Sequence, residues 1–358
     1  MHYPPPVHGA AMVGQYIRES KLVNAEFTNR YINLSTSKSV DEIGQTGVKK
    51  WVRYFEIILR TLENLWFFRP NLVYITLTAK GIGFYKDALL VFVAKLHRKK
   101  VIIHFHNKGV RSRQEYTVDN LLYKWVFNNT KVILLAPELY QDVQKYVAKE
   151  QVYYCSNGIP EINVKKDVQL ILSSEVVLLF LSNLIISKGV LVLLDACKVL
   201  KEQNMKFKCH FVGGAGDLSE VDFEHKIKEL ELGSHVFYLG KKYGDDKIEI
   251  FNDASIFVLP TFYENECFPL VLLEAMQFGL PLVSTDEGGI SSIIDKGENG
   301  FLVLKKDVNS LAGTLKVLIN DADLRMRMGE KSKLEFKEKY TLSIFESNFV
   351  SILKQALN

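Results

Sequence analysis

The sequence has few of the features that mark secreted, membrane-spanning or disulfide-bonded proteins. Its 358 residues include four cysteines, which are widely spaced and form no CxxC pair, so we expect reduced thiols and no disulfide framework. No uninterrupted apolar run reaches the roughly 18 residues that span a bilayer. The first ten residues, MHYPPPVHGA, have neither the basic start nor the apolar core of a signal peptide. These absences predict a cytoplasmic protein.

Sequence repeats and low-complexity tracts are absent as well. Hydrophobic residues make up 47% of the chain and charged residues 24%, which argues against a disordered protein and is typical of a globular one. A globular chain of this length is too long for one ordinary hydrophobic core. We therefore expect two domains.

Acidic residues are scarce in the first part of the chain. Residues 1–160 hold 22 Lys and Arg against 12 Asp and Glu, whereas the remaining residues hold 23 against 29. A basic first domain favours an anionic partner, although basic surface is also common in proteins that have none. The basic residues are not interleaved along one recognition element, so nucleic-acid binding is not expected.

Ten short β-branched or aromatic runs alternate with helical patterns. Because many of these runs are apolar on both faces, they predict parallel sheets covered by helices on both sides, and hence an α/β fold of two doubly wound domains. The polar stretch at 161–169 is the best boundary between the domains. The predicted strands are residues 72–78, 100–106, 131–137, 151–157, 176–182, 208–214, 235–240, 254–260, 280–285 and 300–304.

The stretch YENECFPLVLLEAMQFGLPLVSTDEGG, residues 263–289, places a carboxylate on each side of a proline. Pro269 suits the first position of a helix, which we expect to run to about Phe278. Glu266 then lies in the preceding loop, and Glu274 lies in the second turn of the helix. The amides at the start of a helix lack intrahelical partners, so this start predicts an anion site.

Glu274 is a charge within an otherwise apolar run, and two interpretations remain open. A buried carboxylate needs hydrogen-bond donors, which the hydroxyl groups of a sugar would supply. Alternatively, the side chain lies on a partly exposed stripe and has no function. Residues 286–294, DEGGISSII, predict a second glycine-rich turn before a helix, and so a second anion site nearby.

Several motifs occur in an order that resembles a known family. Residues 266–274 form an E-x7-E pattern followed by AMQFGLPLVSTDEGGISSII, and FLSNLIISKGVLVLLDA and FVGGAGD precede it. The segments PPPVHGAAMVGQYI, HFHN and CSNGIP come earlier in the chain. Together they resemble the retaining family 4 glycosyltransferases (glycosyl transferases group 1) of the GT-B fold, over nearly the whole chain.

The resemblance implies two Rossmann-like domains that face each other across a cleft. It assigns residues 1–163 to an N-terminal acceptor-binding domain and residues 164–340 to a C-terminal nucleotide-sugar-binding domain. A C-terminal helix, residues 341–358, is expected to cross back to the first domain. Family members begin with a buried apolar strand, which is not found before Pro4 here. We expect the melting temperature to rise if such a segment is restored.

For the donor sugar and its nucleotide, the resemblance implies contacts from the carboxylate stretch. Glu266 would lie against the sugar, and Glu274 would accept hydrogen bonds from the ribose. Backbone amides near the start of the helix would hold the sugar hydroxyls. These amides are those of Cys267, Phe268 and Leu270.

The resemblance implies a diphosphate site from residues elsewhere in the chain. Lys188 would neutralise the diphosphate as a point charge. The glycine turn at Gly214 belongs to the same site, and Gly9 would let the backbone approach because it has no Cβ. Asn183 stands where the family has an arginine, so it can hydrogen-bond to phosphate or sugar but carries no charge. His106 corresponds to the family's histidine near the donor sugar.

The implied reaction is glycosyl transfer from a UDP- or GDP-linked donor, with retention of anomeric configuration. The acceptor would be a glycan or a lipid-linked glycan in surface polysaccharide or lipopolysaccharide assembly. Glu266, His106 and Lys188 are the expected catalytic groups, and neither a cofactor nor a metal ion is expected. Two alternatives stay open: a nucleotide-sugar epimerase of the GT-B fold, which needs no acceptor, and a catalytically impaired nucleotide-sugar-binding protein.

The segment KKWVRYFEIILRTLENLWFF, residues 49–68, mixes basic and aromatic residues at helical spacing. It has two interpretations. Such a helix can lie on the inner face of a membrane that carries a lipid-linked acceptor. More commonly, a helix of this kind packs on the neighbouring sheet.

Overall fold

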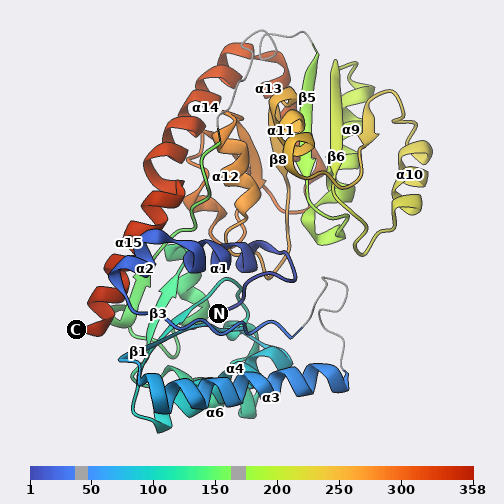
Figure 1. Ribbon diagram of the computed structural model, residues 1–358. Helices are drawn as coiled ribbons and strands as arrows, with labels where there is room; N and C mark the ends of the chain where they lie inside the picture. The colour runs from blue at the N-terminus through green and yellow to red at the C-terminus, as the bar shows by residue number, and fades with distance from the viewer. Residues whose placement is uncertain (37–46, 163–174) are drawn as a thin grey trace. The chain divides into compact units, whose positions relative to one another are not determined.

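The computed structural model describes residues 1–36, 47–162 and 175–358. The chain divides into two compact units, each with its own sheet and helices (Figure 1). Unit 1 consists of Met1–Gly158 and Leu342–Asn358, and unit 2 of Ile159–Thr341. The polar stretch predicted as the boundary lies outside the described residues from residue 163 onward. In the described part of the chain, no helix combines the length and the hydropathy needed to cross a membrane.

All ten predicted strands are confirmed, each shorter than its apolar run. The runs form strands because β-branched and aromatic side chains pack well on a sheet that helices cover on both faces. The strands are β1 (Leu72–Thr76), β2 (Lys100–His104), β3 (Lys131–Leu134), β4 (Val152–Tyr154), β5 (Val176–Leu181), β6 (Phe207–Val212), β7 (Val236–Tyr238), β8 (Ile256–Leu259), β9 (Leu282–Thr285) and β10 (Gly300–Val303).

Unit 2 contains a six-stranded parallel sheet with the order β10-β9-β8-β5-β6-β7. Read from β7 to β10, this is the doubly wound order 3-2-1-4-5-6, whose direction reverses between β5 and β8. Ligands of such sheets bind beyond the carboxyl ends of the strands at this switch point. The helices of the unit are α9 (Val190–Glu202), α10 (Glu220–Glu229), α11 (Gly244–Asp253), α12 (Leu270–Gln277), α13 (Val308–Asn320) and α14 (Ala322–Glu335).

Unit 1 contains a four-stranded parallel sheet with the order β1-β2-β3-β4. Figure 1 shows α1 and α2 on one side of this sheet and α3, α4 and α6 on the other. The last helix of the chain, α15, also belongs to this unit, where the ring of Phe349 lies 5.1 Å from that of Tyr74 in β1. The helices are α1 (Gly9–Glu19), α2 (Lys21–Glu26), α3 (Val48–Glu63), α4 (Gly81–Leu96), α5 (Val110–Arg113), α6 (Thr117–Phe127), α7 (Tyr140–Val143) and α15 (Leu342–Leu357).

Candidate functional site

Two glycines allow loops of unit 2 to pass each other closely at the switch point. Gly189 has a φ of 89°, and a Cβ there would lie 2.2 Å from the carbonyl oxygen of Pro260. Gly213 has a φ of 151°, and a Cβ there would lie 1.9 Å from the carbonyl oxygen of Ser182. Only glycine fits such an approach. The loops after β5, β6 and β8 are thereby held together at one end of the sheet.

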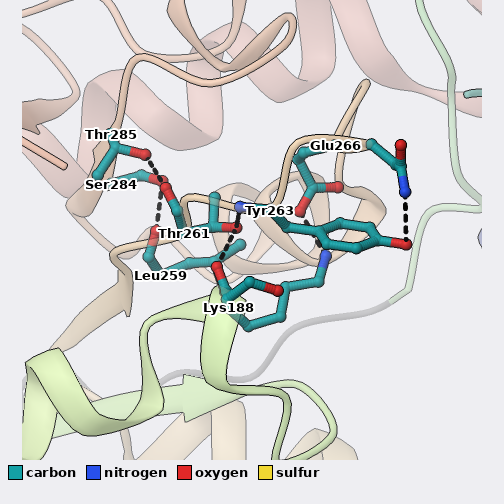
Figure 2. A network of polar contacts seen from close by, with 9 residues as sticks. Lys188, Leu259, Thr261, Tyr263, Glu266, Ser284 and Thr285 are labelled. Carbon is teal, nitrogen blue, oxygen red and sulfur yellow. Dashed lines mark hydrogen bonds and ion pairs between the residues drawn. The ribbon is translucent and has the colours of Figure 1, made fainter. Parts of the chain in front are cut away.

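Lys188 and Glu266 form an ion pair at this end of the sheet. Lys188 ends a short 3-10 helix after β5, and Glu266 lies in the loop between β8 and α12. The exposed fractions of their side chains are 16% and 9%. The ammonium also lies 4.8 Å from the centre of the Tyr263 ring, as Figure 2 shows. The structure therefore brings together two of the three residues that the sequence predicts to be catalytic.

Hydroxyl groups fix the two loops that carry this pair. The hydroxyl of Thr285 donates to the carbonyl oxygen of Thr261, and the Ser284 hydroxyl donates to that of Leu259 over 2.5 Å. Thr261 Oγ1 in turn donates to the carbonyl oxygen of Ser187 over 3.3 Å. These bonds join β9 to the end of β8, and the end of β8 to the residue before the lysine (Figure 2). The ion pair is therefore held by a scaffold of buried bonds.

The helix after Glu266 starts one residue later than predicted. Pro269 is the N-cap, with ψ of 115°, and α12 runs from Leu270 to Gln277. No side chain caps this helix. Within the described residues, the amides of Phe268 and Leu270 donate to no protein acceptor. Such amides attract an anion or a hydroxyl oxygen, as the sequence predicts for this helix start.

Residues 286–294 contain the predicted glycine-rich turn, but the helix predicted after it is wrong. The chain forms only a 3-10 turn at Ile290–Ser292. The turn does not extend because the backbone reverses just after it, where the amide of Asp295 donates to Oδ1 of Asn299 over 2.9 Å. The amide of Gly289 is occupied by the carbonyl oxygen of Cys267 at 2.6 Å. The turn therefore supports the loop before α12 through this hydrogen bond, and residues 286–294 form no second α-helix.

Glu274 is neither buried nor unpaired. Lys247 of α11 binds both oxygens of its carboxylate, at 2.8 Å and 2.7 Å. Each of the two side chains is 28% exposed. Of the two interpretations of Glu274, the buried one is therefore wrong: the side chain is partly exposed, and a lysine from a neighbouring helix supplies hydrogen-bond donors.

Asn183 and Gly214 contact each other in the loops after β5 and β6. The side-chain oxygen of Asn183 accepts a hydrogen bond from the Gly214 amide over 3.2 Å. A Cβ on Gly214 would lie 1.9 Å from Cε of Lys241, so this lysine folds over the glycine turn. Asn183 thus joins two loops of the site. It is uncharged, so the positive charges near these loops are those of Lys188 and Lys241.

The remaining predicted residues, Gly9 and His106, lie in unit 1. Gly9 is the first residue of α1, directly after the N-cap His8, whose Nδ1 accepts from the Ala11 amide over 3.4 Å. His106 follows β2, and its ring centre lies 4.1 Å from that of His104. His104 Nδ1 lies 2.9 Å from the hydroxyl oxygen of Tyr74.

His106 is neutral at physiological pH. Burial lowers its pKa to about 3, and His8 contributes in the same direction. Neither of its ring nitrogens has a hydrogen-bond partner within the described residues. Buried polar atoms usually have a partner, so these nitrogens are candidates to bind a hydroxyl group of a ligand.

Sequence reasoning missed Tyr263, Lys247 and Lys241. Tyr263 is the first residue of the stretch 263–289, and this position three residues before Glu266 is a weak signal of a role in the site. The two lysines approach from other helices and loops, and nothing in their local pattern marks them. Among the described residues, no group of three or more His, Cys, Asp or Glu side chains is placed to hold a metal ion.

Comparison with known proteins gives a family match to most of unit 2. Residues 161–335 match the family model described as glycosyl transferases group 1. The amylovoran biosynthesis glycosyltransferase AmsK of Erwinia amylovora is 27% identical over 244 residues, which are 66% of this chain and 57% of AmsK. The capsular polysaccharide biosynthesis glycosyltransferase CapM of Staphylococcus aureus is 26% identical over 190 residues, 52% of this chain and 49% of CapM. The chain thus spans less than two thirds of the length of these curated relatives.

Solved structures resemble the chain more broadly. HepE from Anabaena in complex with UDP has a TM-score of 0.71 at 18% identity, covering 84% of this chain and 82% of that one. The lipopolysaccharide outer core galactosyltransferase WaaB in its apo form has a TM-score of 0.70 at 15% identity, covering 99% and 98%. Identities this low concern the fold alone, and they confirm the predicted GT-B class with its two Rossmann-like halves.

Proposed function

We propose that the protein is a retaining glycosyltransferase, because residues 161–335 match the family model described as glycosyl transferases group 1. It transfers a sugar from a nucleotide-sugar donor to a glycan or lipid-linked acceptor in surface polysaccharide or lipopolysaccharide assembly. The names of AmsK and CapM support the polysaccharide context. The observation that carries the proposal is the buried Lys188–Glu266 pair at the switch point of unit 2, next to the open amides of α12.

In this proposal Lys188 and Glu266 pair with each other only while no donor is bound. Lys188 releases Glu266 and turns to the diphosphate, whose negative charge increases as the bond to the sugar breaks. Glu266 then accepts hydrogen bonds from the sugar hydroxyls, and the amides of Cys267, Phe268 and Leu270 donate to them. The exchange costs little because each charge has a partner in both states.

The nucleotide occupies the loops that surround this pair. Its diphosphate lies against the glycine turn at Gly214, which Asn183 fixes. Its ribose binds Glu274, which Lys247 orients. A uracil base is favoured, because the structural neighbour HepE was solved with UDP.

The chemistry in this proposal uses no protein nucleophile and no cofactor or metal ion. The departing phosphate oxygen accepts the proton of the acceptor hydroxyl as that hydroxyl attacks the same face of the sugar. Lys188 and the amides stabilise the phosphate. In unit 1, the neutral imidazole of His106 is proposed to hydrogen-bond to a hydroxyl group of a ligand. A neutral imidazole suits this role because it can donate from one nitrogen and accept at the other.

Calorimetric titration with UDP, GDP, ADP and their sugars tests the proposal. We expect one nucleotide to bind, and its sugar to be transferred only when an acceptor glycan is present. Donor conversion without an acceptor would identify an epimerase, and binding without turnover would identify an impaired binding protein. Failure of every nucleotide to bind would contradict the proposal.

We extend the proposal to peripheral contact with a membrane through one face of α3. The apolar residues Val48, Val52, Phe55 and Leu59 recur at helical spacing and are 50% to 80% exposed. They therefore form a solvent-facing stripe, while Tyr54 and Ile57 of the same helix are buried. The stripe continues into the exposed Trp66 and Phe67.

The charges of unit 1 favour an anionic lipid surface as the partner of this stripe. Lys49, Lys50, Arg53 and Arg60 belong to α3, against Glu56 and Glu63. Apolar residues of α4, on the same side of the sheet, are also exposed: Ile82, Leu89, Phe92 and Leu96. An apolar stripe with basic flanks is typical of helices that lie in the headgroup region of a bilayer.

Removal of the apolar stripe is expected to weaken vesicle binding. We expect the Phe55→Ser/Leu59→Ser variant to bind vesicles of phosphatidylglycerol and phosphatidylethanolamine at least about 10-fold more weakly than wild type. The variant lacks two apolar side chains that would be buried in the bilayer on binding. Co-sedimentation measures the effect. Val221→Ser/Val317→Ser, which changes two exposed valines of unit 2, should bind like wild type. Equal binding by both variants, or no binding by wild type, would refute the contact.

A further inference from the structure

Unit 1 contains a surface pocket of about 420 Å³ beside the C-terminal half of α6, which we call the α6 pocket. One wall is a single face of this helix and its C-cap, because the lining residues there recur at helical spacing. The other wall is the turn after α7. Pockets of roughly 300 to 1,000 Å³ are typical of small-ligand sites. The lining residues are Leu121, Lys124, Trp125, Asn128, Lys145 and Tyr146.

The two aromatic rings of the α6 pocket are half-buried and held in place by their neighbours. The ring centre of Trp125 lies 5.3 Å from that of Phe92 in α4, and the ammonium of Lys95 lies 5.1 Å from the centre of the Trp125 ring. The hydroxyl of Tyr146 donates to Oδ1 of Asn120 over 2.8 Å. The rings therefore present fixed apolar surface, which a ligand can cover at little cost in side-chain freedom.

Positive charge at the α6 pocket exceeds negative charge. Lys124 is exposed and pairs with no carboxylate of the described residues. Lys145 lies 3.5 Å from Oε1 of Glu115 and donates to the carbonyl oxygen of Gln114 over 3.3 Å. The side chain of Glu115 is 81% exposed, and an ion pair this open to water contributes little. The pocket therefore favours an anionic ligand.

The remaining groups distinguish an acidic sugar from a phosphate ligand. Phosphates bind preferentially at glycine turns and helix N-termini. No described lining residue is a glycine, and the pocket lies at the other end of α6. The side-chain amide of Asn128 has no partner among the described residues, and it carries both a donor and an acceptor. A sugar hydroxyl can pair with both, whereas an ionised phosphate oxygen can only accept.

We propose that the α6 pocket binds an acidic saccharide, one whose sugar rings carry carboxylate groups. The C–H face of a ring packs on Trp125 and Tyr146, and its hydroxyl groups pair with Asn128. Lys124 and Lys145 pair with the carboxylate. The pocket belongs to unit 1, so it is distinct from the ion pair of unit 2 that carries the proposed function. In that function the saccharide is part of the polysaccharide acceptor; this role, unlike the binding itself, rests on the proposed function.

Calorimetric titration with trigalacturonic acid and its methyl ester tests the pocket, because esterification removes the charges and keeps the rings. We expect the acid to bind wild type at least about 10-fold more tightly than the ester, the contribution of one charged hydrogen bond. Lys124→Gln should bind the acid about 10-fold more weakly than wild type and the ester equally well. Lys21→Gln removes an exposed charge of α2 outside the pocket and should bind like wild type.

Equal affinity for acid and ester, no binding of either, or an equal loss in the two glutamine variants would overturn the proposal. Tighter binding of uridine monophosphate or of phosphatidylglycerol vesicles, weakened by Lys124→Gln, would also overturn it, because the pocket would then be a phosphate site. The saccharide titrations contain no nucleotide. Their failure therefore leaves the proposed function intact, and failure of every nucleotide to bind leaves the saccharide site intact.

Tryptophan fluorescence locates the bound saccharide. The Trp51→Phe/Trp66→Phe variant changes two exposed side chains and leaves Trp125 as the single tryptophan of the chain. We expect the acid to change its emission with the midpoint found by calorimetry, and the ester to do so only at higher concentration. Unchanged emission at a saturating concentration of the acid would place the ligand elsewhere and contradict the assignment.

Discussion

Replacement of Lys188 by alanine is expected to reduce glycosyl transfer by about 100- to 1,000-fold, the loss typical of removing one preorganised charge from a transition state. Nucleotide binding in the calorimeter should fall as well, because Lys188 is the ammonium already held at the switch point. The effect is large because the site has no arginine at position 183, where the asparagine bonds to the Gly214 amide.

The alanine variant also leaves Glu266 as a buried carboxylate without its lysine, which is expected to cost about 3–5 kcal/mol of stability. The double variant Lys188→Met/Glu266→Gln removes both charges and should regain most of this stability without regaining activity. Lys201→Ala, which breaks an exposed pair with Glu231, is the matched control and should behave like wild type. Normal turnover by Lys188→Ala would show that the ion pair is structural only.

Acidification from pH 7 to pH 5 is expected to destabilise unit 1 by several kcal/mol. Burial lowers the pKa of both His2 and His106 to about 3, from an ordinary value of 6.5. Between these values the unfolded chain binds protons that the folded unit does not bind. The stabilisation is therefore complete above pH 6.5 and is lost as the pH falls, at about 2 kcal/mol per histidine by pH 5.

The Met1 amino group and the Asp87 carboxyl act in the same pH range with opposite signs. Burial lowers the pKa of the Met1 amino group from 8.0 to about 5, which adds to the loss of stability in acid. Burial raises the pKa of Asp87 from 3.8 to about 6, so protonation of this carboxyl offsets part of the loss below pH 6. The net slope stays positive with pH, because burial also lowers the pKa of His8 and His104, so five groups of unit 1 favour high pH and Asp87 opposes them.

Urea unfolding at a series of pH values measures this slope. We expect His106→Gln to reduce the change in the free energy of unfolding between pH 7 and pH 5 by the contribution of one histidine. His225→Gln, which changes an exposed histidine of α10, should leave this pH dependence unchanged. Stability that is the same at pH 5 and pH 7 would rule out a buried neutral histidine cluster.

The strands of this protein could be predicted from its sequence because they are short β-branched or aromatic runs, many of them apolar on both faces. The runs before Asn183 and before Tyr263 are examples, and the chemistry placed after them follows from the general rule for parallel sheets. The start of α12 could be predicted to within one residue, because proline cannot occupy a helix interior. These signals depend only on residues close together in the sequence, so one sequence is enough to predict the strands and the start of the helix.

The failed predictions concern contacts between residues far apart in the chain. The partner of Glu274 is Lys247 on another helix, and its presence turns a charge expected to be buried into a half-exposed ion pair. The turn at Ile290–Ser292 reverses because of Asn299, several residues later. The apolar stripe of α3 is a further example. Its helical spacing is the same whether the stripe packs against a sheet or faces solvent, so the sequence alone could not decide between the two.

The assignment of α15 to unit 1 has a consequence for the order in which the protein is made. The helix is synthesised after the whole of Ile159–Thr341, which at about 5–20 residues per second delays it by roughly 10 to 40 s. Until then, the surface of unit 1 that receives Phe345, Phe349 and Leu353 is uncovered on the ribosome. The uninterrupted unit 2 can thus finish folding before α15 is made, whereas unit 1 becomes complete only once α15 has been synthesised.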